Sequence, residues 1–310
     1  MRTKQWLLAA TSAVLSAIVL GPAQAEEARQ AISFGVLPIN QPDTMAERFG
    51  PLIDYLRRET GYPFELRLYT TDTKSGGYDA AVRGLLTGET PFAFLAPVTI
   101  AQARHHDEHV APVVCAIRDG SATYVGHIAV RQDSDITRVE DLIGRRVIGA
   151  SPSSTSGNLM PSGLLVEKGI QKSQFAAMDF AGGHDKAASA VLSGEYDACW
   201  INDKNFRKFK DQGVGLRSIW IHAPVPEMPI AVNTRYVSPE VVQKVSEALL
   251  QMHEKDLEAM RAIDPKYERW VTVDWAAYQP VKETIDKVHG PEFYVIEGWP
   301  VEGALAQKLR

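Results

Sequence analysis

Basic charge, cysteine and low-complexity segments are all scarce in this chain. Its 310 residues include 33 basic and 38 acidic side chains, for a formal net charge of −5, and only two cysteines. An acidic balance argues against nucleic acid as a partner, because basic surfaces bind the phosphate backbone. Long Gly/Ser or charged tracts are also lacking, so we expect the chain beyond its N-terminal segment to be folded, without a tail or a long linker.

Catalytic signatures are missing as well. The sequence has no Gly-rich nucleotide loop, no nucleophile elbow and no paired-carboxylate motif. Two enzyme readings remain open. Cys115 with His127 or His184 would supply a thiol and a base, and residues 105–109 (HHDEH) contain metal-ligand side chains, although such a polar run is more typical of a solvated loop. Catalysis is therefore the least favoured class, and no cofactor is predicted.

The N-terminus has the pattern of a secretory signal. Arg2 and Lys4 precede an apolar run over residues 6–20, shorter than the roughly 20 residues of a membrane span. Ala23 and Ala25 form a signal-peptidase site, so residues 1–25 are predicted to be removed and the mature chain to lie in the periplasm. Cleavage would move the net charge from −5 to −7, because two basic residues are lost. The alternative is an uncleaved membrane anchor.

The mature chain reads as an α/β protein. Apolar runs at residues 32–37, 113–117, 127–130 and 146–150 alternate with amphipathic stretches. This alternation favours mostly parallel sheets flanked by helices. About 285 mature residues exceed the usual size of one domain, so two domains with a shared cleft are expected.

Two helices are predicted from apolar stripes at helical spacing. The first follows Asp43, a good N-cap, and contains Pro51 as a kink or restart. The second runs from Pro239 to about Met260. We expect both stripes to be core. They consist of Met45, Phe49, Leu52, Ile53 and Leu56 in the first helix and of Val241, Val242, Val245, Ala248, Leu249 and Met252 in the second.

An internal echo relates two parts of the chain. Residues 77–89 match residues 183–195 at six of thirteen positions without a gap. Each copy reads as a helix, a Gly-containing turn and a buried strand, which covers residues 92–95 in one copy and 198–201 in the other. The echo predicts two similar lobes. The alternative is coincidence, since such helix-to-strand turns are common.

A run of hydroxyl side chains marks a candidate binding loop. Residues 153–157 (SSTSG) follow the apolar run that ends near Ala150 and precede a helix predicted over residues 159–168. Hydroxyl and N–H groups at a helix N-terminus suit a phosphate-like oxyanion, and open α/β sheets bind ligands beyond the carboxyl ends of their strands. The alternative is a plain Ser/Thr helix cap.

Several of these segments carry a family resemblance. They look like the corresponding parts of the phosphate/phosphite/phosphonate-binding proteins of ABC transporters, over most of the mature chain. The segments are 69–72, 94–97, 118–120, 154–157 with Pro161, 183–188 and 194–198. The resemblance implies a two-lobed periplasmic binding protein, type II-like, that closes around a small oxyanion.

The lobes and part of the site follow from the resemblance. Lobe 1 would comprise residues 26–120 and 220–310 and lobe 2 residues 125–215, with hinges near 118–126 and 205–222. The ligand-binding residues carried over are Ser154, Thr155 and Ser156, which would hold oxygen atoms, His184, which would donate a hydrogen bond, and Tyr69, which would line the pocket from lobe 1.

The chain departs from the family pattern at two places. Residues 98–100 (VTI) stand where family members commonly have an aromatic residue just after the strand, and residues 200–204 (WINDK) stand where phosphonate binders carry an acidic residue for the ligand's amine. An aminoalkyl phosphonate is therefore a poor candidate ligand. Trp200 and Asp203, within the second departure, are kept as candidate ligand-binding residues.

The two cysteines are each predicted in a central strand. Cys115 and Cys199 lie in apolar runs assigned to different lobes. An oxidising compartment favours a disulfide, but a bridge between lobes would clamp the hinge, so two separate buried thiols are preferred. A buried thiol is usually a small apolar side chain. In a cleft, Cys115 would be a soft ligand suited to trivalent arsenic.

Within the family, the chain resembles periplasmic arsenite-binding proteins that report to a membrane sensor kinase controlling arsenite oxidase. The implied arsenic ligand is the cysteine before the Arg-Asp-Gly turn, here Cys115, and His184 and Asp203 would hydrogen-bond the hydroxyls of arsenous acid. The sequence thus predicts a non-catalytic receptor for arsenite or a small inorganic oxyanion that signals to a sensor histidine kinase. The alternatives are the phosphite, phosphate or phosphonate receptor of an ABC permease and, less favoured, a secreted thiol enzyme.

Overall fold

The computed structural model describes residues 30–37, 42–69, 78–211, 215–296 and 299. The predicted signal peptide, residues 1–25, lies outside the described residues, as do residues 70–72 of one resembling segment. The chain from Ala31 onward forms one compact unit. Within the described ranges, no helix has the length and apolar character needed to cross a membrane.

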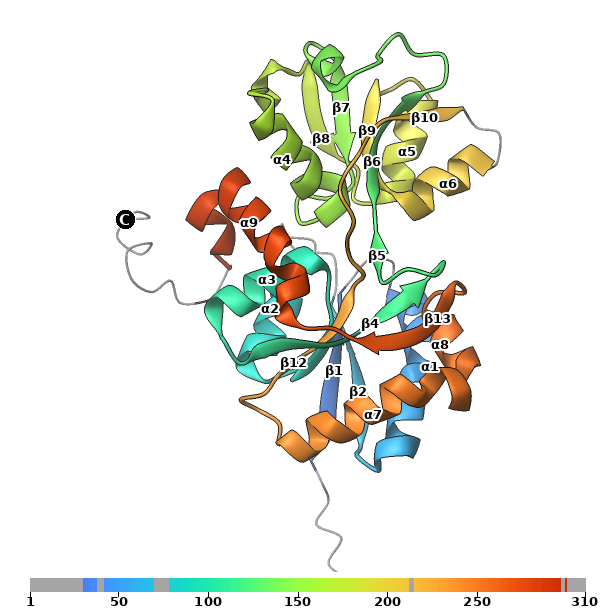
Figure 1. Ribbon diagram of the computed structural model, residues 1–310, viewed down its shortest axis with the longest axis vertical. Helices are drawn as coiled ribbons and strands as arrows, with labels where there is room; N and C mark the ends of the chain where they lie inside the picture. The colour runs from blue at the N-terminus through green and yellow to red at the C-terminus, as the bar shows by residue number, and fades with distance from the viewer. Residues whose placement is uncertain (1–29, 38–41, 70–77, 212–214, 297–298, 300–310) are drawn as a thin grey trace, which may run out of the picture. The chain divides into compact units, whose positions relative to one another are not determined.

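Six strands form the first sheet of this unit, in the order β13-β4-β12-β3-β1-β2 (Figure 1). β1 pairs in parallel with β2 and β3, whereas β12 pairs antiparallel with β3 and β4, and β13 with β4. The bounds are β1 (Ile32–Val36), β2 (Phe64–Leu68), β3 (Phe92–Phe94), β4 (Val110–Arg118), β12 (Pro229–Asn233) and β13 (Tyr267–Thr272).

Five strands form the second sheet, in the order β10-β6-β9-β7-β8. β7 pairs in parallel with β8 and β9, and β6 pairs antiparallel with β9 and β10. The bounds are β6 (Gly126–Arg131), β7 (Arg146–Gly149), β8 (Ala177–Phe180), β9 (Ala198–Asn202) and β10 (Leu216–Ile221). The parallel pairing expected from the sequence therefore holds in β3-β1-β2 and β9-β7-β8. The antiparallel pairs involve β4, β6, β10 and β12, by which the chain leaves or enters a sheet, and β13 at the edge of the first.

The chain crosses between the sheets twice. It passes from β4 to β6 through β5 (Thr123–Tyr124) and returns from β10 to β12 through β11 (Val225–Pro226), and both crossings can be followed in Figure 1. β5 and β11 pair antiparallel with each other. The two crossings thus run side by side, and residues on them lie next to elements of both sheets.

Helices flank both sheets, which confirms the predicted α/β class. The α-helices are α1 (Pro42–Thr60), α2 (Tyr78–Thr87), α3 (Pro97–His106), α4 (Met160–Glu167), α5 (His184–Leu192), α6 (Asp203–Asp211), α7 (Pro239–Lys255), α8 (Leu257–Ile263) and α9 (Gln279–Val288). The short turns are η1 (Val139–Leu142), η2 (Thr155–Leu159), η3 (Lys172–Gln174), η4 (Trp275–Tyr278) and η5 (Gly290–Tyr294).

The predicted apolar stripes of α1 and α7 do form core. All five stripe residues of α1 are buried in one cluster with the stripe residues of α7. Val242 of α7 is the exception, because it is only partly buried. α1 continues through Pro51 without a break. The helix expected to run from Pro239 to about Met260 is instead divided at Asp256, because the Asp256 carboxylate accepts a hydrogen bond from the N–H of Ala259 at 3.1 Å and starts α8.

The two echoed segments occupy equivalent places in the two sheets. α2 leads into β3, which lies beside β1 in the order β3-β1-β2, and α5 leads into β9, which lies beside β7 in the order β9-β7-β8. Gly77, the first residue of one copy, lies outside the described residues. The shared topology supports the prediction of a repeated unit.

The turns of the two copies share their geometry. Gly88 and Gly194, which are equivalent in the echo, have φ angles of +79° and +80°, a conformation that glycine adopts without the strain of a Cβ atom. Each turn is also closed by the same backbone hydrogen bond over six residues. These bonds are Thr90 N–H to Gly84 O at 2.9 Å and Tyr196 N–H to Ala190 O at 3.1 Å.

Candidate functional site

The Ser/Thr loop after β7 folds back on itself around Ser154. The Ser154 hydroxyl accepts a hydrogen bond from the N–H of Gly157 at 2.9 Å, and its carbonyl accepts one from Leu159 at 3.0 Å. Ser154 thus caps a π-helical turn, η2, through which the loop enters α4. Such wide turns are frequent at functional sites. Thr155 and Ser156 are buried within it.

Gly157 is required by this packing. A Cβ atom at this position would lie 2.5 Å from the Cβ of Ala150 and 2.8 Å from the Oγ of Ser154. Only glycine therefore lets the loop approach the end of β7 this closely. The loop is held against its own strand, so the positions of its hydroxyls are set by backbone contacts.

An element of the first sheet meets the loop at the N-terminus of α3. The N–H of Val98 donates a hydrogen bond to Oγ1 of Thr155 at 3.2 Å. Val98 is in the first turn of α3, where backbone N–H groups have no partner within the helix. Although the Val98 side chain departs from the aromatic residue of the family pattern, its backbone still contributes to the candidate site.

His184 lies next to the loop from the start of α5. Its Nδ1 accepts a hydrogen bond from the N–H of Asn202 at 3.1 Å, and its Nε2 lies 3.5 Å from Oγ of Ser154. Burial lowers the pKa of His184 from 6.5 to about 4, so the ring is neutral at pH 7. Because Nδ1 accepts, the proton of the neutral ring is on Nε2. His184 therefore presents a hydrogen-bond donor beside Ser154.

Tyr124, on β5, completes this cluster and was not among the predicted site residues. Its hydroxyl lies near the side chains of Thr155 and Ser156, which act to lower its pKa. Burial, together with the nearby charge of Glu227, raises the pKa of Tyr124 well above its ordinary value. The phenol is therefore a neutral donor or acceptor at physiological pH.

His222, after β10 on the second crossing, was missed as well. Its side chain is 2% exposed. A Cβ atom placed on Gly126 would lie 2.5 Å from Cβ of Ser156 and 2.9 Å from Nε2 of His222, so both are close to one point. We call Tyr124, Ser154, Thr155, Ser156, His184 and His222 the hydroxyl site.

Two predicted residues, Tyr69 and Trp200, pack elsewhere. The Tyr69 hydroxyl is hydrogen-bonded to Thr90 at 3.0 Å, and the ring belongs to the core around α2. Trp200 is fully buried in the core of the second sheet, with Phe175 at 6.5 Å between ring centroids and the Lys172 amine 5.4 Å from its ring. The contacts found for these two rings are with core residues rather than with the hydroxyl site.

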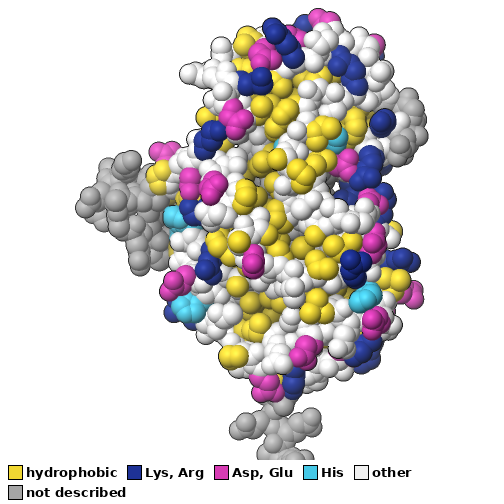
Figure 2. All heavy atoms as spheres, viewed as in Figure 1, with side chains coloured by type: hydrophobic (Ala, Val, Ile, Leu, Met, Phe, Trp, Pro, Cys, Tyr) yellow, Lys and Arg dark blue, Asp and Glu magenta, His cyan; other side chains and the backbone are white. Residues whose placement is uncertain are grey.

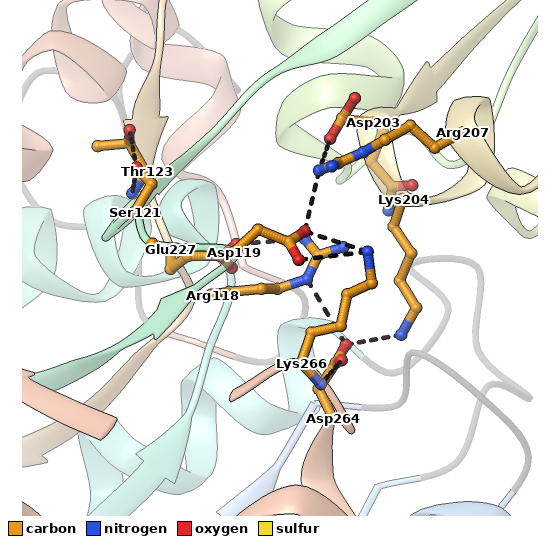
Figure 3. A network of polar contacts seen from close by, with 12 residues as sticks. Arg118, Asp119, Ser121, Thr123, Asp203, Lys204, Arg207, Glu227, Asp264 and Lys266 are labelled. Atoms are coloured by element: carbon orange, nitrogen blue, oxygen red, sulfur yellow. Dashed lines mark hydrogen bonds and ion pairs between the residues drawn. The ribbon is translucent and has the colours of Figure 1, made fainter. Parts of the chain in front are cut away.

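Asp203 belongs to a second cluster, drawn in Figure 3. Its carboxylate pairs with Arg207 and lies 3.2 Å from Nε2 of His127. Arg207 in turn pairs with Asp119 at 3.1 Å. These residues are part of a larger set of ion pairs that we call the ionic network. It consists of Arg118, Asp119, Asp203, Lys204, Arg207, Glu227, Asp264 and Lys266. The structure thus separates Asp203 from the serines with which it was expected to act.

The two cysteines are free and buried, Cys115 on β4 and Cys199 on β9 in the other sheet. Burial, with the charge of Glu227 second, raises the pKa of Cys115 to about 11, so it is a neutral thiol at pH 7. Burial alone raises the pKa of Cys199 further. Neither thiol has the lowered pKa of an activated nucleophile.

The HHDEH segment is only in part the solvated loop that was expected, because residues 107–109 form the turn between α3 and β4. His105 and His106 end α3, where the His105 ring stacks on Tyr294 at 3.7 Å, and Asp107 pairs with Arg235. Among the described residues, no group of three or more His, Cys, Asp or Glu side chains is placed to hold a metal ion.

On the face drawn in Figure 2, charged side chains of both signs are interspersed without a single-sign patch. An apolar groove is also present among the described residues. The groove has a volume of about 580 Å³ and lies between α7 and the neighbouring ends of β4 and β12. Its lining, which includes Val113, Val237 and Val242, contains none of the predicted site residues.

Comparison with known proteins decides the family. Residues 34–278 match the family described as the periplasmic phosphonate substrate-binding protein of ABC transporters. The chain belongs to this family. Its members are solute-binding proteins of the periplasm and serve ABC transporters, so the chain is a binding protein and not an enzyme.

Individual relatives agree with this assignment. The chain is 29% identical over 242 residues to the phosphate-import protein PhnD of Mycolicibacterium smegmatis, with 73% of each chain covered. It is 27% identical over 237 residues to the phosphonates-binding periplasmic protein of Escherichia coli, with 72% of this chain and 67% of that protein covered. The structure of PhnD1 from Prochlorococcus marinus in complex with methylphosphonate has a TM-score of 0.70 at 19% identity, covering 84% of this chain and 98% of that one. The last match confirms the fold of a two-lobed binding protein.

Proposed function

We propose that this chain binds a small phosphorus oxyanion, such as phosphate, phosphite or methylphosphonate, at the hydroxyl site and delivers it to an ABC permease. The observation that carries the proposal is the 3.2 Å contact between the N–H of Val98 and Oγ1 of Thr155. It joins the N-terminus of a helix on the first sheet to the Ser/Thr loop of the second. An oxyanion held there would take hydrogen bonds from both.

The donors of the hydroxyl site suit such a ligand. The hydroxyl groups of Thr155 and Ser156 and the Nε2–H of His184 are neutral donors, and the N–H of Val98 at the start of α3 reaches the same loop. Neutral donors with helix-terminal N–H groups are sufficient to bind an oxyanion without a paired cation. The hydrogen bonds from these donors replace those from water, so the oxyanion can remain charged in the site.

The second departure from the family pattern favours a ligand without an amine. Asp203 is engaged by Arg207 and His127, and Lys204 pairs with Asp264 at 2.6 Å. An aminoalkyl group would need a carboxylate that the ionic network already uses. Phosphate, phosphite and methylphosphonate make no such demand.

The proposed action is closure of two lobes around the ligand. We place lobe 1 on the first sheet and lobe 2 on the second, near the expected bounds of 26–120 with 220–310 and of 125–215, except that β10, which belongs to the second sheet, extends lobe 2 to Ile221. The hinges then lie at the crossing through β5, within the expected 118–126, and at the crossing through β11, just beyond the expected 205–222. A ligand that touches both lobes stabilises the closed form by its higher affinity for that form.

Calorimetric titration of the mature protein with phosphate, phosphite and methylphosphonate tests the proposal. Thr155→Val keeps the shape of the side chain and removes its hydroxyl. We expect affinity to fall roughly 10- to 100-fold, the effect of losing one hydrogen bond to a charged group. Thr137→Val is the matched control, because the Thr137 hydroxyl bonds Asp141 far along the chain from the loop. Equal affinities of Thr155→Val and wild type would contradict the proposal.

Arsenite sensing through Cys115 is the second candidate, with a sensor histidine kinase as partner. The observation in its favour is that Cys115 is a free thiol, close enough to Glu227 for that charge to raise its pKa. Titration with arsenite under reducing conditions separates the two readings. Arsenite binding that is lost in Cys115→Ser and kept in Cys199→Ser would support arsenite as the ligand. The absence of a heat of binding with arsenite would exclude arsenite as the ligand.

A further inference from the structure

One buried atom at the hydroxyl site has no hydrogen-bond partner among the described residues. It is Nε2 of His222, on the crossing that returns through β11. The side chain is 2% exposed. Buried polar atoms in folded proteins are almost always paired, so an unpaired one needs an explanation. A bound ligand would give Nε2 of His222 a hydrogen-bond partner if the atom lies beside the candidate binding residues.

The surroundings place Nε2 beside the residues that would hold the ligand. Ser156 Cβ and His222 Nε2 lie 2.5 and 2.9 Å from the same point, the position of a Cβ atom on Gly126. The two atoms are therefore no more than about 5.4 Å apart. The Tyr124 ring, whose hydroxyl lies near Ser156, faces the His222 ring edge-on at 6.1 Å. Nε2 thus adjoins the hydroxyl cluster.

The hydrogen bond at the other ring nitrogen decides what Nε2 can do. Nδ1 lies 2.6 Å from the carbonyl oxygen of Ala223. A carbonyl oxygen only accepts, so Nδ1 carries a proton and donates it. Burial, and then the neighbouring His127, lowers the pKa of His222, which keeps the ring neutral. Nε2 is then a bare lone pair, and it can only accept.

The two histidines of the site are therefore opposite in character. The backbone N–H of Asn202 donates to Nδ1 of His184, which leaves a proton on Nε2. The backbone carbonyl of Ala223 accepts from Nδ1 of His222, which leaves a lone pair on Nε2. One backbone group in each case sets the tautomer. A ligand that satisfies both rings must accept from His184 and donate to His222.

We propose that His222 accepts a hydrogen bond from a protonated oxygen of the ligand, so that the site selects oxyanions that keep an O–H group. This inference rests on the proposed function. It narrows the ligand class to singly protonated phosphate, methylphosphonate and similar phosphorus oxyacids. Sulfate and sulfonates have the same tetrahedral shape, but they carry no proton, and their oxygen lone pairs would face the lone pair of Nε2.

Methylphosphonate and methanesulfonate form a matched pair for the test. At slightly acidic pH both have one negative charge and one methyl group, and only methylphosphonate has an O–H. We expect the wild-type protein to prefer methylphosphonate in calorimetric titrations. His222→Phe removes the acceptor and should reduce that preference roughly 10- to 100-fold, since a site built around a hydrogen bond discriminates through it. His222→Gln keeps an acceptor oxygen and should retain part of the preference.

His289→Phe is the control. Nε2 of His289 is likewise buried without a hydrogen-bond partner among the described residues, but its ring stacks on Phe293, outside the hydroxyl site. Its replacement should leave the ratio of the two affinities as in wild type. A ratio unchanged by His222→Phe, or wild-type protein that binds both ligands equally, overturns the role of His222 while the proposed function stands. Failure of the wild-type protein to bind any of phosphate, phosphite and methylphosphonate overturns both.

A measurement on the wild-type protein removes any dependence on the folding of variants. Nitrogen-15 NMR of the histidine side chains reports which ring nitrogen carries the proton. The proposal requires the proton of His222 on Nδ1, and a change in the Nε2 signal when methylphosphonate is added. A proton on Nε2 in the free protein, or no change of that signal with saturating methylphosphonate, would refute it.

Discussion

The hydroxyl site and the ionic network both join residues of the two sheets, and they do so with opposite chemistry. The hydroxyl site uses hydroxyls, a backbone N–H and two neutral imidazoles. The ionic network uses equal numbers of cationic and anionic side chains, with Arg207–Asp119 and Lys204–Asp264 as the bridging pairs (Figure 3). Neutral groups exchange a small ligand for water at low cost, whereas buried ion pairs are costly to leave half broken. We therefore expect the hydroxyl site to exchange ligand and the ionic network to stabilise the fold.

Removal of Arg118 should have the largest effect on stability. Its side chain is 9% exposed between Glu227 and Asp264, which are each 8% exposed. Arg118→Met leaves Glu227 as a buried carboxylate without its cation. We expect the free energy of unfolding to fall by about 3–5 kcal/mol, measured by urea denaturation. Arg118→Met combined with Glu227→Gln should recover part of the loss. A single variant as stable as wild type would refute the assignment of stability to the network.

Gly126→Ala should affect the hydroxyl site instead. The new methyl group would lie 2.5 Å from Cβ of Ser156 and 2.9 Å from Nε2 of His222, between two residues of the proposed binding site. Overpacking of this kind costs about 1–3 kcal/mol, so methylphosphonate should bind roughly 10- to 100-fold more weakly. Gly50→Ala, in α1, is the control, because a Cβ there meets nothing within 4 Å. Undiminished affinity in Gly126→Ala would place the ligand elsewhere.

Acid should destabilise the folded protein through His184, a residue of the hydroxyl site. The pKa of this ring is about 4 in the folded protein and 6.5 as a model group, so the unfolded chain binds the extra proton first. The free energy of unfolding should therefore fall as pH falls from about 6.5 to about 4. His184→Gln should make this decline shallower but not abolish it, since burial also lowers the pKa of His222. Denaturation midpoints across that pH range provide the measurement, and identical slopes would contradict the neutral tautomer.

Arg207→Gln should have the smallest effect. Arg207 is 43% exposed where it pairs with Asp119, so water already screens the pair. We expect a loss of at most about 1 kcal/mol in unfolding free energy, smaller still at high salt. A loss as large as that of Arg118→Met would mean that the exposed and buried parts of the ionic network act as one unit.

The sequence predicted the parts of the fold that local patterns determine. The echo located α2, α5 and the turns at Gly88 and Gly194, because a helix, a left-handed glycine and an apolar strand each leave a local signal. The division of the second long helix was missed, since an interior aspartate such as Asp256 looks like any exposed helix position until its carboxylate is seen to cap α8.

The candidate site was predicted on one side only. The Ser154 loop and His184 stand at the starts of helices, where sequence signals are strong. Tyr124 and His222 come from the two crossings, which carry no periodic pattern and reach the loop only through the pairing of β5 with β11. Asp203 was expected at the site from its position in a motif, but its partner Arg207 lies one helical turn away and holds it in the ionic network.

The two copies of the repeated unit differ in the side chain that begins their helix. At the first residue of the repeated helix, one copy has Tyr78 and the other has His184. Burial raises the pKa of Tyr78 to about 12, and this phenol is near enough to Tyr124 to influence its ionisation. A duplicated architecture can therefore diversify in its recognition chemistry one half at a time. Exchanging position 78 would change a group near Tyr124 while His184, its counterpart in the other copy, remains as it is.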